Sequence, residues 1–184
     1  MDEEIVGKVL TVLVAKDPNS MKSTPIETVE VTFEGFQGDK HSGWTKPSDG
    51  RTNFYARGTT IRNNRQISLI SKEETDLIAS TLGIDQILPE WMGANLLISD
   101  IPEFSSLEPN SRLFFSSGVV LLITAENHPC MTLSKEIASN FPDRPELVGK
   151  IVAASKNLRG LVAVVELPGY IKKGDDVRVM HAHK

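Results

Sequence analysis

The chain of 184 residues contains one cysteine, Cys130. A single thiol excludes an internal disulfide and also excludes metal sites built from two or four cysteines. The residue is therefore expected to be a free thiol in a reducing compartment, which predicts a cytoplasmic protein. The start of the chain, Met1-Asp2-Glu3-Glu4, is acidic and the apolar stretch that follows contains Lys8, so no secretory signal peptide is expected.

Long apolar runs and an excess of positive charge are also missing. Uninterrupted apolar runs such as residues 119–123 are far shorter than the ~20 residues that a membrane-spanning helix needs. The formal net charge is −4, which argues against a broad nucleic-acid-binding surface because phosphate neutralisation requires a basic face. Neither a membrane span nor a nucleic-acid partner is expected.

The pattern of apolar residues predicts many short strands. Residues 28–34 alternate most clearly, since Val29, Val31 and Phe33 are separated by polar residues, as in a half-buried strand. With 40% hydrophobic residues and no linker, a single domain over residues 1–184 is expected. Further strands are predicted at residues 6–15, 65–70, 95–98, 112–115, 119–125, 161–167 and 175–180.

Helical signals are fewer than strand signals. Ser71 can cap a helix, Glu74 lies at the capping-box position three residues later, and Gly83 ends the pattern. Shorter helices are predicted at residues 132–140 and 145–155. Because strands dominate without regular strand–helix alternation, we expect a mainly β fold, a closed or partly closed barrel with a few short helices.

Residues 44–64 follow no periodic pattern. The segment is polar and longer than most connections, which is typical of functional lids or of disordered segments. It holds Arg51, Arg57 and Arg62, and Arg65 opens the next predicted strand. Guanidinium groups suit phosphates and carboxylates, so converging arginines would hold an anionic cofactor. The alternative is a solvated loop that carries scattered positive charge.

Residues 35–43 follow the clearest strand and contain three glycines. Glycine permits positive φ angles and close approach of the backbone to a ligand, so the segment could form an anion-binding nest with Asp39 and His41 at its rim. The alternative is a tight turn in which Asp39 binds its own backbone. Spacing alone leaves both interpretations open.

Cys130 lies just after the apolar run at residues 119–125. Free cysteine is among the most buried residue types, so an inert core residue is one interpretation. A functional thiol would need a lowered pKa. His128, Lys135 or the start of the helix predicted at Thr132 could provide it.

Five short motifs occur in order along residues 35–179. They are Gly38-Asp39-x-His41-x-Gly43, Arg65-x-x-Ser68-Leu69, Gly93-Ala94-Asn95-Leu96, Pro129-Cys130, and Arg159-Gly160 followed by Gly174-Asp175. Each motif is common by itself. Together and in this order they resemble the MOSC family, which is named after the carboxy-terminal domain of molybdenum cofactor sulfurases.

The resemblance implies a MOSC-type β-barrel, similar to the β-barrel domain of pyruvate kinase, with one functional cysteine. In the family this cysteine is proposed to carry sulfur as a persulfide, and in cofactor-bound relatives it ligates molybdenum. Cys130 would take either role here, beside a pocket for the molybdenum cofactor. With two arginines of the 44–64 segment added, the expected cofactor-binding residues are Gly38, Asp39, His41, Arg57, Arg62, Arg65, Ser68 and Asn95.

The implied partners are a cysteine desulfurase that donates sulfur and a molybdenum or metal–sulfur acceptor protein. Pyridoxal phosphate would be bound only by the desulfurase, since this chain has no lysine motif for it. The sequence departs from the family at Ala94, which replaces an acid, and at Asn127, where some short bacterial relatives have arginine.

Three functions therefore remain open. The first is a sulfur carrier or transferase acting through Cys130 in metal–sulfur or molybdenum-cofactor metabolism. The second is a molybdenum-cofactor-dependent reductase of N-hydroxylated compounds, with Cys130 as the metal ligand. The third is a binding module that keeps the barrel without the chemistry.

Overall fold

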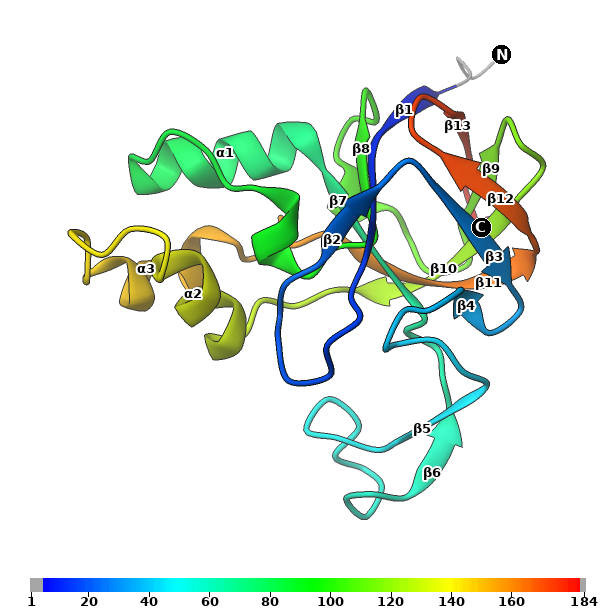
Figure 1. Ribbon diagram of the computed structural model, residues 1–184, viewed down its shortest axis with the longest axis horizontal. Helices are drawn as coiled ribbons and strands as arrows, with labels where there is room; N and C mark the ends of the chain where they lie inside the picture. The colour runs from blue at the N-terminus through cyan, green and yellow to red at the C-terminus, as the bar shows by residue number, and fades with distance from the viewer. Residues whose placement is uncertain (1–4, 183–184) are drawn as a thin grey trace.

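A closed ring of seven strands organises the molecule, which a computed structural model describes over residues 5–182 (Figure 1). Strands β1 and β13 pair and close the ring, and β7 and β8 pair in parallel. In ring order the strands are β1 (Val6–Val14), β8 (Leu96–Ser99), β7 (Ile67–Ser71), β11 (Leu161–Leu167), β10 (Val120–Glu126), β9 (Arg112–Phe115) and β13 (Asp176–Met180). The predicted mainly β barrel is confirmed. Residues 1–4, whose acidic character led us to expect no signal peptide, lie outside the described part of the chain.

Alternation along the strands fills the inside of this barrel. In β13, Val177 and Val179 are buried while Asp176 and Arg178 are exposed, because successive side chains point to opposite faces. The interior core also contains large side chains from connecting segments, such as Phe104. The barrel is therefore a packed core, and a ligand must bind outside it.

A second, three-stranded sheet lies against the barrel. Strand β3 (Thr28–Thr32) pairs with β12 (Gly169–Lys172) on one side and with β4 (Gly35–Phe36) on the other, while β2 (Thr24–Ile26) extends β1. The strands β2, β4 and β12 were not predicted. Strands β2 and β4 have only three and two residues, too few to show alternation, and β12 places its two large side chains, Tyr170 and Ile171, next to each other instead of alternating them.

The segment at residues 44–64, here called the arm, projects away from the barrel (Figure 1). Strands β5 (Thr45–Pro47) and β6 (Thr60–Arg62) pair as an antiparallel hairpin at its base. The arm, in which the sequence showed no periodic pattern, therefore has a short strand at each end. Each strand has only three residues, so the sequence could not show the pairing.

Three short helices gather on one side of the barrel (Figure 1): α1 (Lys72–Leu82), α2 (Met131–Ala138) and α3 (Leu147–Ala154). They bury a second apolar core between them, and two 3₁₀ turns, Pro89–Met92 and Phe104–Ser106, complete the connections. Among residues 5–182, no helix has both the length and the apolar character needed to cross a membrane.

The predicted capping box of α1 is half right. The amide of Glu74 donates to Ser71 Oγ at 3.3 Å, so Ser71 caps the helix. The carboxylate of Glu74 does not return to Ser71 but accepts hydrogen bonds from the amide and the hydroxyl of Ser105. Burial raises the pKa of Glu74, although these hydrogen bonds oppose the increase.

Candidate functional site: a cationic pocket beside Cys130

Cys130 lies in the connection between strand β10 and helix α2. Strand β10 ends at Glu126, and Cys130 takes the N-cap position of α2 with extended backbone angles (φ −139°, ψ 167°). Its carbonyl accepts the helix hydrogen bond from Ser134 at 3.1 Å. The side chain is only partly buried against the helix core, so the thiol is neither core filler nor fully solvated.

The surroundings of Cys130 favour its thiolate form. Burial alone would raise the pKa of the thiol, but the amides of Leu133 and Thr132 and the charges of Arg51 and Arg159 outweigh it. The pKa of Cys130 is therefore lowered. The start of the helix contributes as expected from the sequence, whereas His128 and Lys135 are not among the causes.

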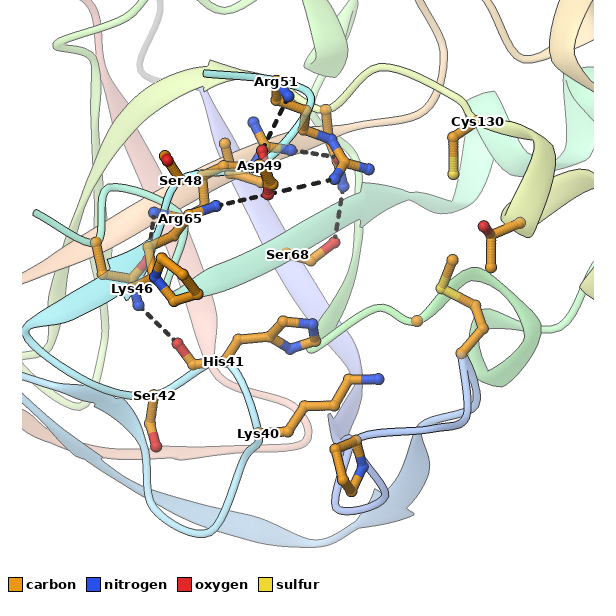
Figure 2. Close-up of a pocket in the computed structure, with 18 of the residues that line it drawn as sticks. Lys40, His41, Ser42, Lys46, Ser48, Asp49, Arg51, Arg65, Ser68 and Cys130 are labelled. Carbon is orange, nitrogen blue, oxygen red and sulfur yellow. Dashed lines mark hydrogen bonds and ion pairs between the residues drawn. The ribbon is translucent and has the colours of Figure 1, made fainter. Parts of the chain in front are cut away.

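A pocket of about 820 Å³ opens beside this thiol (Figure 2). Its wall comes from the β1–β2 connection, the turn after β4, the arm, β7 and the start of α2. The structure thus brings together segments separated by more than a hundred positions. Of the residues predicted from the sequence, those that line this pocket are His41, Arg57, Arg65, Ser68 and Cys130.

The pocket is strongly cationic although the chain as a whole is acidic. Asp49 is the one acidic residue among the described residues that line it, and Lys46 Nζ approaches its carboxylate at 3.0 Å. Figure 2 shows arginine and lysine side chains on several sides of the same space. The lysines and arginines that line the pocket are Lys40, Lys46, Arg51, Arg57, Arg65 and Arg159. We call this site the cationic pocket.

Arg159 is a site residue that the sequence did not predict, as are Lys40 and Lys46. Its side chain is only 5% exposed, its Nη2 donates to the carbonyl of Met92, and its Nη1 is buried without a hydrogen-bond partner in the protein. Burial, together with the charges of nearby arginines, lowers its pKa to about 10, although the Cys130 thiolate opposes this. A buried guanidinium nitrogen without a partner is costly, which points to a missing anionic or acceptor group.

Gly160 explains how Arg159 reaches this position. The backbone of Gly160 has a positive φ of 92°, and a Cβ there would collide with the carbonyl oxygen of Leu69. Glycine is therefore required for the close approach of this segment to β7. The Arg159-Gly160 motif was the only sequence signal for the residue, and it gave no information about burial.

Asn127 and Ser68 hold Arg65 in the pocket wall. Arg65 Nη2 donates to Asn127 Oδ1 at 2.8 Å, and Asn127 Nδ2 donates to Ser68 Oγ at 3.1 Å. Burial and the charge of Arg51 lower the pKa of Arg65. Asn127, a departure from some relatives, is therefore an acceptor for a pocket arginine, which an arginine at this position could not be.

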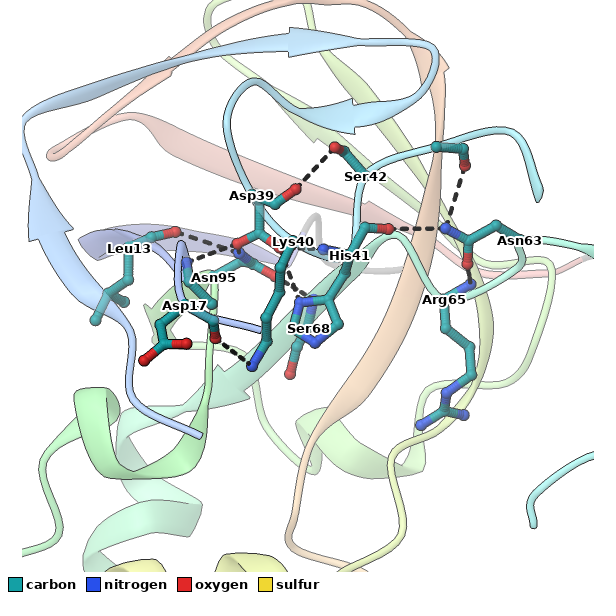
Figure 3. A network of polar contacts seen from close by, with 12 residues as sticks. Leu13, Asp17, Asp39, Lys40, His41, Ser42, Asn63, Arg65, Ser68 and Asn95 are labelled. Atoms are coloured by element: carbon teal, nitrogen blue, oxygen red, sulfur yellow. Dashed lines mark hydrogen bonds and ion pairs between the residues drawn. The ribbon is translucent and has the colours of Figure 1, made fainter. Parts of the chain in front are cut away.

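Asp39 and Asn95 form a buried network behind the pocket rather than part of its lining (Figure 3). Asp39 Oδ2 accepts from the amide of Ala15 at 2.8 Å and from Asn95 Nδ2 at 2.7 Å. Asp39 Oδ1 accepts from the amide and from Nδ1 of His41, both at 2.8 Å. Asn95 Oδ1 in turn accepts from the amide of Ser68 at 2.9 Å. We call these five residues the Asp39 network.

This network fixes His41 at the pocket rim. Burial alone would raise the pKa of Asp39, but hydrogen bonds from His41 and from the amide of Ala15 outweigh it and lower the pKa. The imidazole is held by the carboxylate while its side chain stays 43% exposed. Asp39 and Asn95 therefore act as supports, and His41 and Ser68 are the members of the group that line the pocket.

The glycine-rich turn at residues 35–43 is not an anion-binding nest. Every amide from residue 39 to residue 43 donates to an acceptor of the protein itself, and Asp39 binds its own turn. Gly38 lies outside the pocket lining, and its positive φ of 79° serves the turn. The plainer interpretation of this segment, a self-binding turn, is the one that the hydrogen bonds support.

Arg62 also lies outside the pocket lining. Its guanidinium carbon lies 4.7 Å from the centroid of the Trp44 ring, in a cation–π contact at the base of the arm. Trp44 in turn stacks on Phe33. Of the arm arginines, Arg51 and Arg57 line the pocket and Arg62 braces the hairpin.

The chain is similar to known proteins over most of its length. Residues 49–178 match the MOSC domain family. YuaD of Bacillus subtilis (strain 168), which is named for metal-sulfur cluster biosynthesis, is 40% identical over 163 residues, or 89% of this chain and 85% of YuaD. The motif at residues 38–43 precedes the stretch matched by the family.

Solved structures give the same result for the fold. The crystal structure of the Bacillus subtilis YuaD protein has a TM-score of 0.95 and 37% identity, with 100% of both chains covered. YiiM from Escherichia coli has a TM-score of 0.58 at 12% identity, covering 96% of this chain and 71% of that one. At that identity, the likeness concerns the fold alone. The match to the family and the identity to YuaD together show that the chain belongs to the MOSC domain family.

Proposed function

We propose that this protein carries sulfur as a persulfide on Cys130 and delivers it in metal–sulfur cluster biosynthesis. The observation that carries the proposal is the position of Cys130 at the N-terminus of α2, partly exposed in a cationic pocket that lowers its pKa. A thiolate is the nucleophile in sulfur transfer, so this environment favours the reaction. The name of YuaD, 40% identical, supports the same field of chemistry.

The proposed reaction is a balanced thiol–persulfide exchange. The Cys130 thiolate attacks the outer sulfur of a persulfide on a cysteine desulfurase, and the sulfur–sulfur bond of the donor breaks. The donor thiolate leaves with the electron pair, and Cys130 keeps the transferred sulfur. Pyridoxal phosphate belongs to the desulfurase in this scheme. The reaction requires a reduced Cys130, which fits a reducing compartment such as the cytoplasm.

The pocket residues have separate roles in this proposal. The buried Nη1 of Arg159 donates to the anionic sulfur of the persulfide, which gives this nitrogen the acceptor that the protein itself does not provide. Arg65, held by Asn127, adds positive charge to the same space. Both groups stabilise an anion at Cys130 more than they stabilise a neutral thiol.

A second candidate is a molybdenum-cofactor-dependent reductase, and the arginine cluster favours it. Among the described residues, no group of three or more histidine, cysteine or carboxylate side chains could hold a metal. A molybdenum ion would therefore need the ligands of its own cofactor in addition to Cys130. Arg51, Arg57 and Arg65 suit the phosphate of such a cofactor, and the bound metal would supply redox chemistry.

One experiment separates these candidates. Freshly purified protein is assayed for molybdenum and pterin, then reduced and incubated with a cysteine desulfurase, cysteine and pyridoxal phosphate. We expect the intact mass of the protein to increase by one sulfur atom, and we expect the increase to disappear after treatment with a reductant. The Cys130→Ser variant should gain no sulfur.

The outcomes are distinct. Bound pterin and molybdenum, with activity on an N-hydroxylated substrate, would support the reductase instead. If Cys130 gains no sulfur and no cofactor is present, the sulfur-carrier proposal is wrong and a binding module remains. A Cys130→Ser variant that still gains sulfur would move the chemistry to another residue.

A further inference from the structure

The distribution of charge at the pocket is opposite to that of the chain. The sequence holds 20 lysine and arginine residues against 24 aspartate and glutamate residues, yet six of the former and one of the latter line the pocket. Like charges gathered in a concave space repel one another unless an anion is bound there. The arrangement therefore points to an anionic ligand.

Internal contacts do not cancel this positive charge. Lys46 and Arg51 approach Asp49 at 3.0 and 3.9 Å, so the single carboxylate is shared by two cations. Lys40 Nζ donates to the backbone carbonyls of Asp17 and Ser20, which hold its position without neutralising it. Arg65 donates to the neutral amide of Asn127.

Cations reach the pocket both from the arm and from the turn between α3 and β11, which contains Arg159. Arg159 lines the pocket, is only 5% exposed, and has a buried Nη1 without a partner in the protein. Arg51 and Arg57 come from the arm, and of these two only Arg51 is among the charges that lower the pKa of Cys130. Arg159 and Arg51 thus suit an anionic atom at the thiol, and Arg57 suits a charged end of the same molecule.

We propose that the pocket accepts a small anionic persulfide, a low-molecular-weight thiol compound that carries carboxylate or phosphate groups, as a direct sulfur donor to Cys130. The inference rests on the proposed function and names a substrate class for the same site. Arg57 binds the carboxylate or phosphate end, while Arg159 donates to the anionic sulfur at Cys130 and Arg51 adds positive charge beside it. The pocket volume of about 820 Å³ lies within the range of small-molecule sites.

The transfer balances without an oxidant. The Cys130 thiolate attacks the outer sulfur of the donor persulfide, the donor sulfur–sulfur bond breaks, and the small thiolate leaves with the electron pair. The leaving thiolate takes up the proton that the donor persulfide carried. Cys130 ends as a persulfide, and the donor ends as an ordinary thiol.

The test compares donors that differ in charge. The reduced full-length protein is mixed with the persulfide of glutathione, which bears carboxylates, or with the persulfide of glutathione diethyl ester, in which they are blocked. The rate constant for the gain of one sulfur atom is measured by intact mass. The ratio of the two rate constants, glutathione donor over ester donor, is divided by the same ratio measured with a small neutral thiol as acceptor, so that donor reactivity cancels.

We expect the protein to favour the anionic donor by about tenfold or more, within the range by which electrostatic attraction raises association rates. The preference should shrink as ionic strength rises. The Arg57→Ala variant should lose most of it, whereas Arg62→Ala, in the same arm but outside the lining, should keep it. Because the ratio compares two donors on one thiol, a change in thiolate fraction does not affect it.

The failure of this inference differs from the failure of the proposed function. If a desulfurase loads Cys130 but the two glutathione donors load it equally or not at all, only the small-donor inference is wrong. Equal losses in Arg57→Ala and Arg62→Ala would also overturn it. If no donor of any kind loads Cys130, both proposals are wrong.

Discussion

The buried polar groups on two sides of the pocket differ in how completely they are hydrogen-bonded. In the Asp39 network, both carboxylate oxygens of a buried aspartate accept two hydrogen bonds each from protein donors. On the side of Cys130, Arg159 is as deeply buried as Asp39, yet one of its guanidinium nitrogens has no partner. Hydrogen bonds within the protein fully compensate the burial of Asp39 but only partly compensate the burial of Arg159.

This difference distinguishes residues that support the fold from residues that are available to bind a ligand. A buried polar group with all its partners stabilises the fold and leaves nothing for a ligand, while an unsatisfied one costs stability unless a ligand completes it. The Asp39 network therefore positions strands β1, β7 and β8 and the His41 turn. The groups around Cys130 keep their bonding capacity for an incoming molecule.

The largest effect is expected from Asp39→Ala. The substitution leaves the amides of Ala15 and His41 without an acceptor, each at a cost of about 1–3 kcal/mol. It also removes one of the two acceptors of Asn95 Nδ2, which keeps the Leu13 carbonyl at 3.3 Å. We expect the free energy of unfolding in urea to fall by about 3 kcal/mol or more. A loss below about 1 kcal/mol would show that these hydrogen bonds do not support the fold.

A smaller effect is expected in the acid range. The pKa of Asp39 is lowered in the folded state, so its contribution is complete above the unfolded value of about 3.9 and is lost as pH falls through the folded value. The free energy of unfolding should therefore decrease less steeply with falling pH in Asp39→Asn than in the wild type. The pKa values of Glu73 and Asp49 are also lowered, and these two residues contribute equally to the pH dependence of the free energy of unfolding in both proteins. Identical slopes would contradict the role given to Asp39.

The smallest effect on stability is expected from Arg159→Met. The variant loses one hydrogen bond to Met92 but also removes a buried cation whose Nη1 is unsatisfied, so the two effects oppose each other. We expect the free energy of unfolding to stay within about 1 kcal/mol of the wild type. The pKa of Cys130 should rise, because Arg159 is among the charges that lower it.

The pH dependence of thiol alkylation measures that rise, and Arg159→Lys serves as the matched control because it keeps the charge. A rise in the pKa of Cys130 with methionine but not with lysine separates charge from packing. If Arg159→Met instead unfolds the protein while Asp39→Ala is tolerated, the two sides of the pocket have been assigned the wrong way round.

The sequence predicted the long strands of the barrel because alternation over four or more residues is visible, as at residues 28–34 and in β13. It did not predict β5 and β6, whose pairing depends on three residues each. Motif order indicated which segments meet near Cys130. It could not tell a lining residue such as His41 from a supporting one such as Asp39, since a motif does not specify which side chain turns inward.

Arg159 shows a second limit. Its burial depends on the approach of Gly160 to β7, a contact between segments about ninety positions apart. Nothing local in the sequence indicates that one nitrogen of this arginine lacks a partner. The same holds for Asn127, whose role as acceptor for Arg65 follows only from the folded positions of both residues.

Alkylation of Cys130 in the native protein probes the thiolate and the charge of the pocket together, because this residue is the only thiol of the chain. Iodoacetamide is neutral and iodoacetate is anionic, so their rates at neutral pH report thiolate reactivity and pocket charge together. We predict that Cys130 reacts faster than free cysteine with both reagents, and that it favours iodoacetate relative to free cysteine. Reaction only after unfolding, or the same preference as free cysteine, would contradict a reactive thiolate in a cationic pocket.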